Sequence, residues 1–158
     1  MAIGHLALTI AALFTGAAIY VSVAEQPARL GLDDRALLTE WKPSYKRGAA
    51  MQASLALLAF LLGMVAWWQM GRTAFLIGAL FMLAPWPWTL LVIKPTNDAL
   101  LATDPIKADG KTRALIVKWG RLHLVRTALG ALGTIAFLYA LAADEAFLVH
   151  RLFGISRT

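Results

Sequence analysis

The sequence contains no cysteine and few charged residues. Of its 158 residues, 15% are Asp, Glu, Lys or Arg and 59% are hydrophobic, whereas an average soluble protein has about 25% charged residues. Without cysteine the chain has no disulfides, thiolate metal ligands or cysteine nucleophiles, and cysteine usage says nothing of its redox compartment. The shortage of charge predicts a membrane protein, and the length predicts one domain, residues 1–158.

Acidic residues are scarcer than basic ones, 9 against 15, which gives a formal net charge of +6. A basic chain can bind nucleic acid, but long apolar runs make anionic lipid headgroups and membrane topology the better explanation. The chain also lacks a glycine-rich nucleotide-binding pattern and a low-complexity tract. We therefore expect membrane lipids as partners and no nucleic acid.

The sequence is dominated by long apolar runs without charged residues. They predict four transmembrane helices, at about residues 2–24, 48–70, 73–94 and 119–143, each long enough to cross the roughly 30 Å hydrocarbon core. A cleaved signal peptide fits the first run poorly, because its N-terminal part has no Lys or Arg. The expected fold is all-α, a membrane-spanning four-helix bundle.

Prolines mark the expected breaks between the first two helices. Pro27 is expected to end the first helix, because it cannot donate to the helical ladder and restricts the residue before it. Pro43 is expected to end a short helix over about residues 30–42. Leu37 and Trp41 help to give this short helix one apolar side, which is typical of a helix lying along the membrane interface.

The second half of the chain has a similar pattern of breaks. Pro85 and Pro87 are expected to kink or unwind the third helix. The last helix is expected to start near Thr112 and to reach Ala143. The tail over residues 144–158 is either an interfacial helix or a solvated end.

Orientation follows from the distribution of basic residues. Successive helices alternate in direction, so the first and third connections share one side of the membrane. Together they carry 11 of the 15 Lys and Arg residues, whereas the other side carries Arg72, Arg151 and Arg157. The positive-inside tendency predicts that both long connections are cytoplasmic and both termini outside, in a bacterial inner membrane.

The same alternation brings polar and aromatic residues to one membrane face. On the last helix, Trp119, His123 and Arg126 are spaced i, i+4 and i+7 and share one side. The other helix ends at this face carry Tyr20, Glu25, Trp41, Tyr45, Arg47, Gln52 and Asn97. Ionisable side chains are costly in a membrane unless function or pairing holds them. We therefore predict a polar, aromatic-lined pocket that opens here.

His123 is the candidate general base or metal ligand of this pocket, and the alternative is a structural histidine at a helix end. Glu25 could orient the imidazole, ligate a metal, or form a structural ion pair with Arg29, Arg47 or Arg126. Arg126 could stabilise an enolate or phenolate oxygen, or bind a lipid phosphate.

The remaining candidates would bind substrate. Asn97 and Gln52 can hydrogen-bond a substrate oxygen, although such amides also cap helices or join them. Aromatic side chains could stack on a flat aromatic molecule, although interfacial aromatics are ordinary in membrane proteins. These aromatic candidates are Tyr20, Trp41, Tyr45 and Trp119, with Arg47 beside them.

No metal site is predicted within one chain, because one His, one Glu and no Cys make a poor set of ligands. A metal between Glu25 and His123 stays open as an alternative, since a homo-oligomer could add ligands, and the sequence requires no cofactor. Glycines in the helices permit close contacts either within one chain or between chains. They are Gly16, Gly63, Gly78, Gly130 and Gly133.

Four motifs resemble those of the DUF1772 family, the anthrone oxygenase-like membrane proteins. In chain order they lie at residues 14–29, 41–52, 92–97 and 119–127. The resemblance implies a small four-helix membrane protein, and for some members the oxygenation of anthrones to anthraquinones without a known organic cofactor. Family members often have His where this chain has Gln26, so any role of that His is absent or changed here.

Two functions are compatible with these residues. In the first, the protein is an oxygenase that acts on a small hydrophobic, anthrone- or phenol-like substrate. His123 is then the base, Glu25 orients it, and Arg126 with Asn97 holds the oxyanion. In the second, a non-catalytic membrane protein binds a lipid, a quinone or a partner helix in the same pocket.

Overall fold

The computed structural model describes residues 2–153, and the side chains of residues 2–143. Every regular element in this part of the chain is helical, which confirms the all-α prediction. The elements are α1 (Ala2–Tyr20), η1 (Val21–Glu25), α2 (Gln26–Leu30), α3 (Asp34–Met70), α4 (Thr73–Leu83), α5 (Pro85–Trp88), η2 (Thr89–Ile93), α6 (Lys94–Ala102), η3 (Pro105–Lys107) and α7 (Gly110–Phe153).

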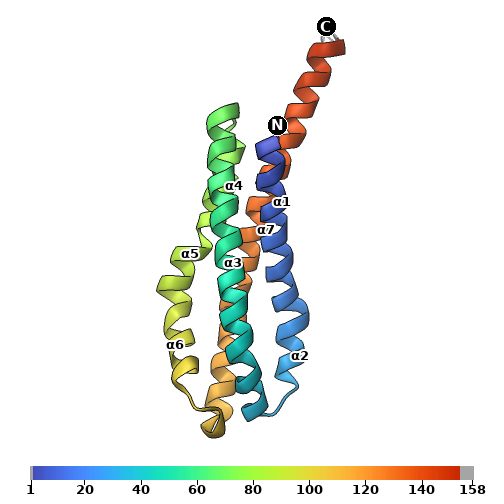
Figure 1. Ribbon diagram of the computed structural model, residues 1–158. Coiled ribbons are helices and arrows are strands. Elements are labelled where there is room, and N and C mark those ends of the chain that lie inside the picture. The colour runs from blue at the N-terminus through green and yellow to red at the C-terminus, as the bar shows by residue number, and fades with distance from the viewer. Residues whose placement is uncertain (1, 154–158) are drawn as a thin grey trace.

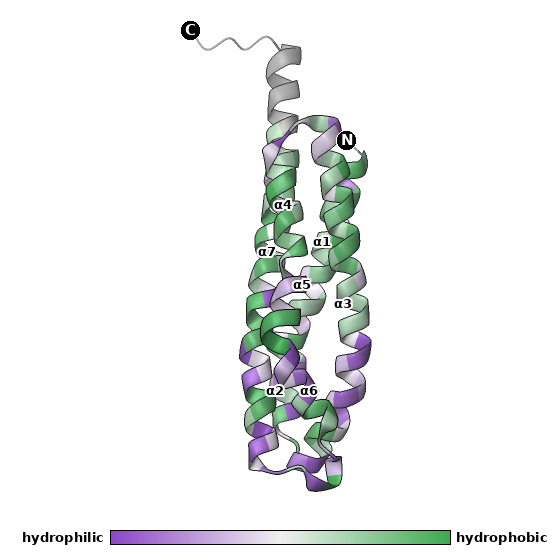
Figure 2. Cartoon of the chain, turned by 90° about the vertical axis from the view of Figure 1, so that its left-hand side faces the viewer, coloured by the Kyte–Doolittle hydropathy of each residue, from purple (hydrophilic) through white to green (hydrophobic). Residues whose placement is uncertain are grey.

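These elements form four long rods, residues 2–30, 34–70, 73–102 and 110–143, each long and apolar enough to cross a membrane. The four apolar helices suggest an integral membrane protein. Figure 1 shows the start of α1 and the last turns of α7 at one end of the bundle, with the connections after α2 and α6 at the other. Polar residues gather at this second end, around α2 and α6 (Figure 2).

Each of the two π-helical turns lies just before a proline. One residue, Gln26, separates η1 from Pro27, and one residue, Lys94, separates η2 from Pro95. In both, the N–H of that residue donates to a carbonyl five positions back, so the turn is wider than an α-helical one. The wide turn gives the rings of Pro27 and Pro95 room without ending the helix. The prediction that Pro27 ends the first helix is therefore wrong, and the first rod runs on to Leu30.

Pro43 does not end a helix either. The short separate helix predicted over residues 30–42 is instead the first part of α3, which continues through Pro43 to Met70. Proline removes the donor only for the carbonyl four residues back, and that residue, Thr39, is exposed. Trp41 before the proline and Gln52 after it are both buried, so packing on each side holds the two parts in one helix.

The third rod is disrupted where expected. The chain makes a turn at Ala84, directly before Pro85, and Figure 1 shows it stepping sideways between α4 and α5. The rod then continues as η2 and α6 to Ala102, beyond the predicted end near residue 94.

The last helix, α7, begins at Gly110, slightly before the predicted start at Thr112. Its cap is Asp109, whose Oδ1 accepts hydrogen bonds from the N–H groups of Lys111 and Thr112 at 3.0 Å each. The helix continues to Phe153. Whether the tail lies along the interface or in solvent depends on residues outside the described side chains.

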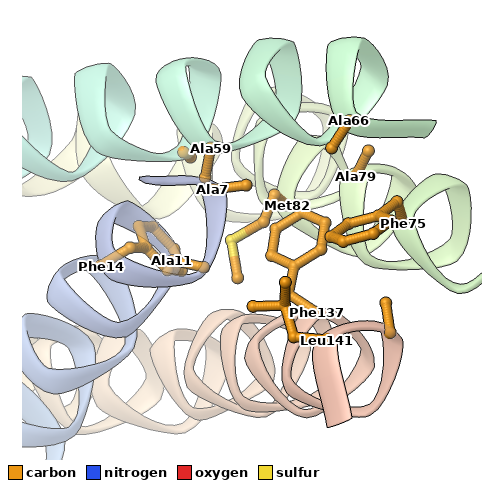
Figure 3. Packing of buried hydrophobic residues seen from close by; sticks show 12 residues of the cluster. Ala7, Ala11, Phe14, Ala59, Ala66, Phe75, Ala79, Met82, Phe137 and Leu141 are labelled. Atoms are coloured by element: carbon orange, nitrogen blue, oxygen red, sulfur yellow. The ribbon is translucent and has the colours of Figure 1, made fainter. Parts of the chain in front are cut away.

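Phe137 of α7 fills the apolar part of the bundle. Its ring centroid lies 6.0 Å from that of Phe75, and Figure 3 shows it among the labelled core side chains beside Phe75 and Met82. Glycines make room for this ring, because a Cβ at Gly63 or Gly78 would come within 2.5 Å of it. Gly130 and Gly133 also meet side chains of the same chain, whereas Gly16 has nothing within 4 Å of its Cβ position.

A second buried cluster lies toward the polar end and supports the site. Its members come from α3, η2, α6 and α7: Leu37, Leu38, Trp41, Ile93, Leu100, Ile116 and Trp119. Because these side chains pack together, they fix how the polar faces of α3 and α7 are set toward each other.

Candidate functional site

A small cavity of about 40 Å³ lies between η1, α2, α3 and α7. We call it the His123 cavity. A volume of about 10–15 Å³ holds one water, so the cavity has room for a few water-sized molecules. Six of the predicted residues line it: Glu25, Tyr45, Gln52, Trp119, His123 and Arg126. The structure thus brings together groups from three of the four rods, whereas the sequence predicted that all four would contribute.

His123 is held by Ser22 of η1. The Nδ1 atom of His123 lies 3.1 Å from Ser22 Oγ, and His123 is only 3% exposed. Ser22 Oγ also lies 3.0 Å from Thr127 Oγ1 and 3.0 Å from the carbonyl oxygen of Ala18. The imidazole is therefore fixed by a hydroxyl network that joins the first and last rods.

This network is compatible with the Nδ1–H tautomer of His123. Carbonyl oxygens only accept, and the carbonyl of Ala18 lies 3.0 Å from Ser22 Oγ and 3.2 Å from Thr127 Oγ1. When Ser22 gives its single proton to Ala18, Ser22 Oγ accepts from its other two neighbours. All three contacts are satisfied together when the Nδ1–H of His123 and the hydroxyl of Thr127 donate to Ser22 Oγ. The proton then sits on Nδ1, and Nε2 keeps the free lone pair that a general base needs.

Glu25 does not orient His123, contrary to the prediction. Its carboxylate is paired with Arg29, one turn along the helix. The Arg29 side chain is 3% exposed, and its Nη2 also donates to Ser44 Oγ at 2.9 Å, while Nε lies 3.2 Å from Glu40 Oε2. Glu25 neutralises a buried guanidinium, and Ser22 performs the positioning that the sequence assigned to Glu25.

Arg126 is the other buried cation of the cavity, 7% exposed. Its Nη2 donates to Gln52 Oε1 at 3.2 Å, and its buried Nε has no hydrogen-bond partner among the described residues. In the same part of the chain, no carboxylate forms an ion pair with it. An uncompensated buried guanidinium favours an anionic ligand close by.

The cavity as a whole is electropositive. The guanidinium groups of Arg29 and Arg126 line it together with the carboxylate of Glu25. Arg29 already uses that carboxylate. The positive charge of Arg126 is therefore left to act on whatever occupies the cavity.

Aromatic side chains form a stack behind the cavity. Tyr45 lies parallel to Trp41, with ring centroids 4.8 Å apart and planes at 3°. Trp119 meets the edge of Trp41 at 5.7 Å and stacks on His123 at 5.1 Å. The stack fixes the plane of the imidazole from a second side, in addition to Ser22.

Four predicted substrate residues lie outside the His123 cavity. Trp41 is fully buried behind Tyr45 and Trp119. Asn97 is 2% exposed and does not line the cavity. Tyr20 and Arg47 line a shallower groove on the outer side of α1 and α3, which shares Glu25 and Gln52 with the cavity.

Sequence reasoning missed Ser22 and Ser44 as parts of the site, and it named Arg29 only as a possible ion-pair partner of Glu25, which the structure confirms. A lone serine in an apolar run gives no signal, and the π-helical turn that carries Ser22 is not visible in hydropathy. Arg29 was counted as a loop residue because Pro27 was expected to end the helix before it. Gln26, at the position of the family's His, does not line the cavity and donates to the carbonyl of Ile116 at 3.0 Å.

A metal ligand set is not assembled at this site. Among the described residues, no group of three or more His, Asp or Glu side chains could hold a metal ion. His123 points its Nδ1 at a serine, and Glu25 is engaged by Arg29. The groups that remain are suited to proton transfer and to stabilising an anion.

Comparison with known proteins agrees with these features. Residues 41–136 match a family model described as anthrone oxygenase. Anthrone oxygenase tpcL of Aspergillus fumigatus is 32% identical over 133 residues, which cover 77% of this chain and 81% of that protein. Anthrone oxygenase ptaC of Pestalotiopsis fici is 28% identical over 124 residues, 68% of this chain and 86% of that protein. No solved structure matches the chain significantly. By its family match and its relatives, the chain belongs to the anthrone oxygenase family.

Proposed function

We propose that this protein is a membrane-embedded oxygenase that uses dioxygen to convert an acidic CH₂ group of a small hydrophobic aromatic substrate, of the anthrone type, into a ketone. Family membership and the names of two relatives support the reaction class. The observation that carries the proposal is the pairing, in one cavity, of a buried histidine, fixed through Nδ1, with a buried arginine that lacks an ion-pair partner among the described residues.

His123 is the base in this proposal. Its Nε2 lone pair removes a proton from the CH₂ group between the two aromatic rings of the substrate. The hydrogen bond to Ser22 and the stack on Trp119 hold the ring in place, so little reorganisation is needed during proton transfer.

Arg126 stabilises the anion that results. The electron pair left by the proton spreads onto the substrate oxygen, and the guanidinium, held by Gln52, stabilises the negative charge. We assign the second polar contact to Gln52 or Tyr45 rather than to Asn97, because only these two line the cavity.

Dioxygen then reacts with the electron-rich carbon. The carbon–oxygen bond forms as the electron pair passes to dioxygen, and the peroxide anion takes the proton back from His123. Loss of water, with cleavage of the O–O bond and of the second C–H bond, leaves the ketone. The balance is one CH₂ group and one O₂ converted to one ketone and one water, with no external reductant.

The membrane location of the protein in this proposal follows from its four apolar helices. We propose that the protein lies in a bacterial inner membrane with both long connections cytoplasmic, in contact with lipids. The substrate then arrives from the bilayer. A homo-oligomer remains part of the proposal, with the exposed face at Gly16 as one surface for contact between copies.

The test is oxygen consumption by the purified full-length protein in lipid nanodiscs with anthrone. We expect one O₂ consumed per anthraquinone formed, and one ¹⁸O atom in the new carbonyl when ¹⁸O₂ is supplied. Uptake no faster than in protein-free nanodiscs, with a panel of anthrones and phenols, would overturn the proposed function in favour of a binding protein.

A further inference from the structure

A second pocket lies beside the His123 cavity and is larger, about 140 Å³. We call it the lateral pocket. Its walls are Ala49, Ala53 and Ala56 of α3, Pro85 and Trp86 of α5, Thr89 and Leu90 of η2, and Arg126 of α7. Trp86 and Leu90 are 38% and 56% exposed. These residues lie on the outer surface of an apolar rod, so the pocket borders the region that lipid would occupy.

The break in the third rod and the small residues of α3 together create this space. The chain turns at Ala84 and then passes through Pro85 and the wide turn η2. Opposite it, Ala49, Ala53 and Ala56 are spaced i, i+4 and i+7, so three methyl groups face the break where larger side chains would fill it.

Two residues that line this apolar pocket each carry a buried polar atom without a hydrogen-bond partner among the described residues. These atoms are Arg126 Nε and Thr89 Oγ1. A buried donor without a hydrogen-bond partner destabilises the folded protein, and Arg126 is only 7% exposed. A ligand oxygen between the two would satisfy both, since Arg donates and Thr can donate or accept.

The lateral pocket is adjacent to the His123 cavity. Both are lined by Ala49 and Arg126. Through Nη2, Arg126 donates to Gln52 on the cavity side, while its Nε has no hydrogen-bond partner in the part of the chain whose side chains are described. The guanidinium of Arg126 thus borders both the His123 cavity and the lateral pocket.

We propose that the lateral pocket binds one ring of a planar aromatic molecule that carries an oxygen on its edge, a phenol or aryl ketone, entering sideways from the bilayer. The proposal rests on the proposed function. An apolar cavity of about 150 Å³ holds benzene, so about 140 Å³ accepts one ring. Further fused rings extend outward past Trp86, and the oxygen binds Arg126 Nε and Thr89 Oγ1.

A lipid acyl chain fits this pocket less well. It would fill the apolar walls but leave Arg126 Nε and Thr89 Oγ1 without partners. An oxygenated aromatic satisfies them and brings its oxygen to the same guanidinium that faces the His123 cavity. In an anthrone the reacting CH₂ belongs to the same ring as the carbonyl, opposite it, so this binding mode would hold that ring beside the His123 cavity.

Binding without turnover tests the proposal. The full-length protein in phosphatidylcholine nanodiscs is titrated with anthrone under nitrogen, so that no oxygenation occurs. We expect Ala53→Leu, which fills the pocket, to weaken binding at least tenfold, and Ala50→Leu, on the exposed side of α3, to leave it unchanged. Thr89→Val, of similar shape, is expected to weaken anthrone binding about five- to tenfold, and Thr89→Ser to restore it.

Anthracene, which lacks the oxygen, supplies the matched ligand. We expect it to bind wild type and Thr89→Val equally. Equal anthrone binding by Ala53→Leu and Ala50→Leu would overturn the location, and equal binding of anthrone and anthracene by wild type would overturn the oxygen recognition. Anthrone binding that responds to these variants without oxygen uptake in air would contradict only the proposed function. Oxygen uptake that Ala53→Leu leaves intact would contradict only the lateral pocket.

Discussion

Ser22 and His123 are 101 positions apart in the chain, yet Ser22 Oγ lies 3.1 Å from His123 Nδ1. The contact joins the π-helical turn of the first rod to the last rod. When Ser22 gives its own proton to the carbonyl of Ala18, it accepts from Nδ1 and leaves Nε2 free. The proposed base is thus oriented by a neutral hydroxyl.

Removal of this hydroxyl is expected to lower turnover without removing substrate binding. In Ser22→Ala the imidazole loses the side chain that holds its Nδ1. Loss of the comparable partner of a metal-bound histidine costs about 10–100-fold in activity, and we expect a loss of similar size for a positioned base. We expect kcat for anthrone oxygenation to fall by this amount with KM nearly unchanged, and Ser22→Thr to recover most of the loss. Ser54→Ala is the control, since the Ser54 hydroxyl bonds only the carbonyl of Ala50. Equal activity of Ser22→Ala and Ser54→Ala would show that Ser22 does not position the base.

Arg29 is expected to matter for stability. In Arg29→Met, the carboxylate of Glu25 and that of Glu40 lose their shared partner, and breaking a largely buried pair costs about 1–3 kcal/mol. The midpoint of unfolding in SDS should fall accordingly. Lys94→Met breaks an ion pair with the same i, i+4 spacing whose two side chains are each 56% exposed, and it should cost at most about 0.5 kcal/mol. Equal losses in the two variants would contradict this account.

The packing of Phe137 gives a further prediction. In Gly63→Ala the new methyl group would lie 2.5 Å from Phe137 Cζ, and the ring cannot move away because Gly78 bounds it equally closely. We expect a loss of about 1–3 kcal/mol in the free energy of unfolding. Gly16→Ala, with nothing within 4 Å, should be neutral or gain up to about 1 kcal/mol from helix propensity. A loss in Gly63→Ala no greater than that in Gly16→Ala would contradict this packing of Phe137.

Much of the fold could be predicted from the sequence, because hydropathy reports helix length directly. The four charge-free runs fall on the four rods, and the break at Pro85 lies where expected. The errors concern prolines whose effect depends on their surroundings. Pro27 follows a π-helical turn that gives its ring room, and Pro43 lies in a helix with buried residues on both sides.

The site was less predictable than the fold. Helix alternation was enough to bring Glu25, Tyr45 and His123 to one cavity. It could not tell which side chain contacts His123, because a wide turn changes which residues face α7. Asn97 was predicted to line the pocket, but it is buried and does not line the cavity. Side-chain direction depends on local helix winding, which hydropathy does not report.

Asp109, which lies outside the four rods, makes a pH-dependent contribution to the stability of the fold. The N–H group and the hydroxyl of Thr112, and then the N–H group of Lys111, donate to its carboxylate, and these bonds hold its pKa below the ordinary value of 3.8. The stabilisation is therefore complete above that value and is lost as the pH falls through the folded-state pKa. We expect Asp109→Ala to lower the thermal midpoint near pH 7, and the difference from wild type to shrink as the pH falls below about 4. A difference that is constant with pH would contradict the capping role.

The most direct test of the proposed base compares His123→Ala with wild type in nanodiscs, with oxygen uptake and anthraquinone formation followed together and anthrone binding measured separately under nitrogen. The account predicts that turnover falls by at least about a hundredfold, while anthrone still binds in the lateral pocket within a few-fold of wild type. Turnover equal to that of wild type by a correctly folded His123→Ala protein would contradict the account, because the imidazole that lines the cavity would then have no part in the reaction.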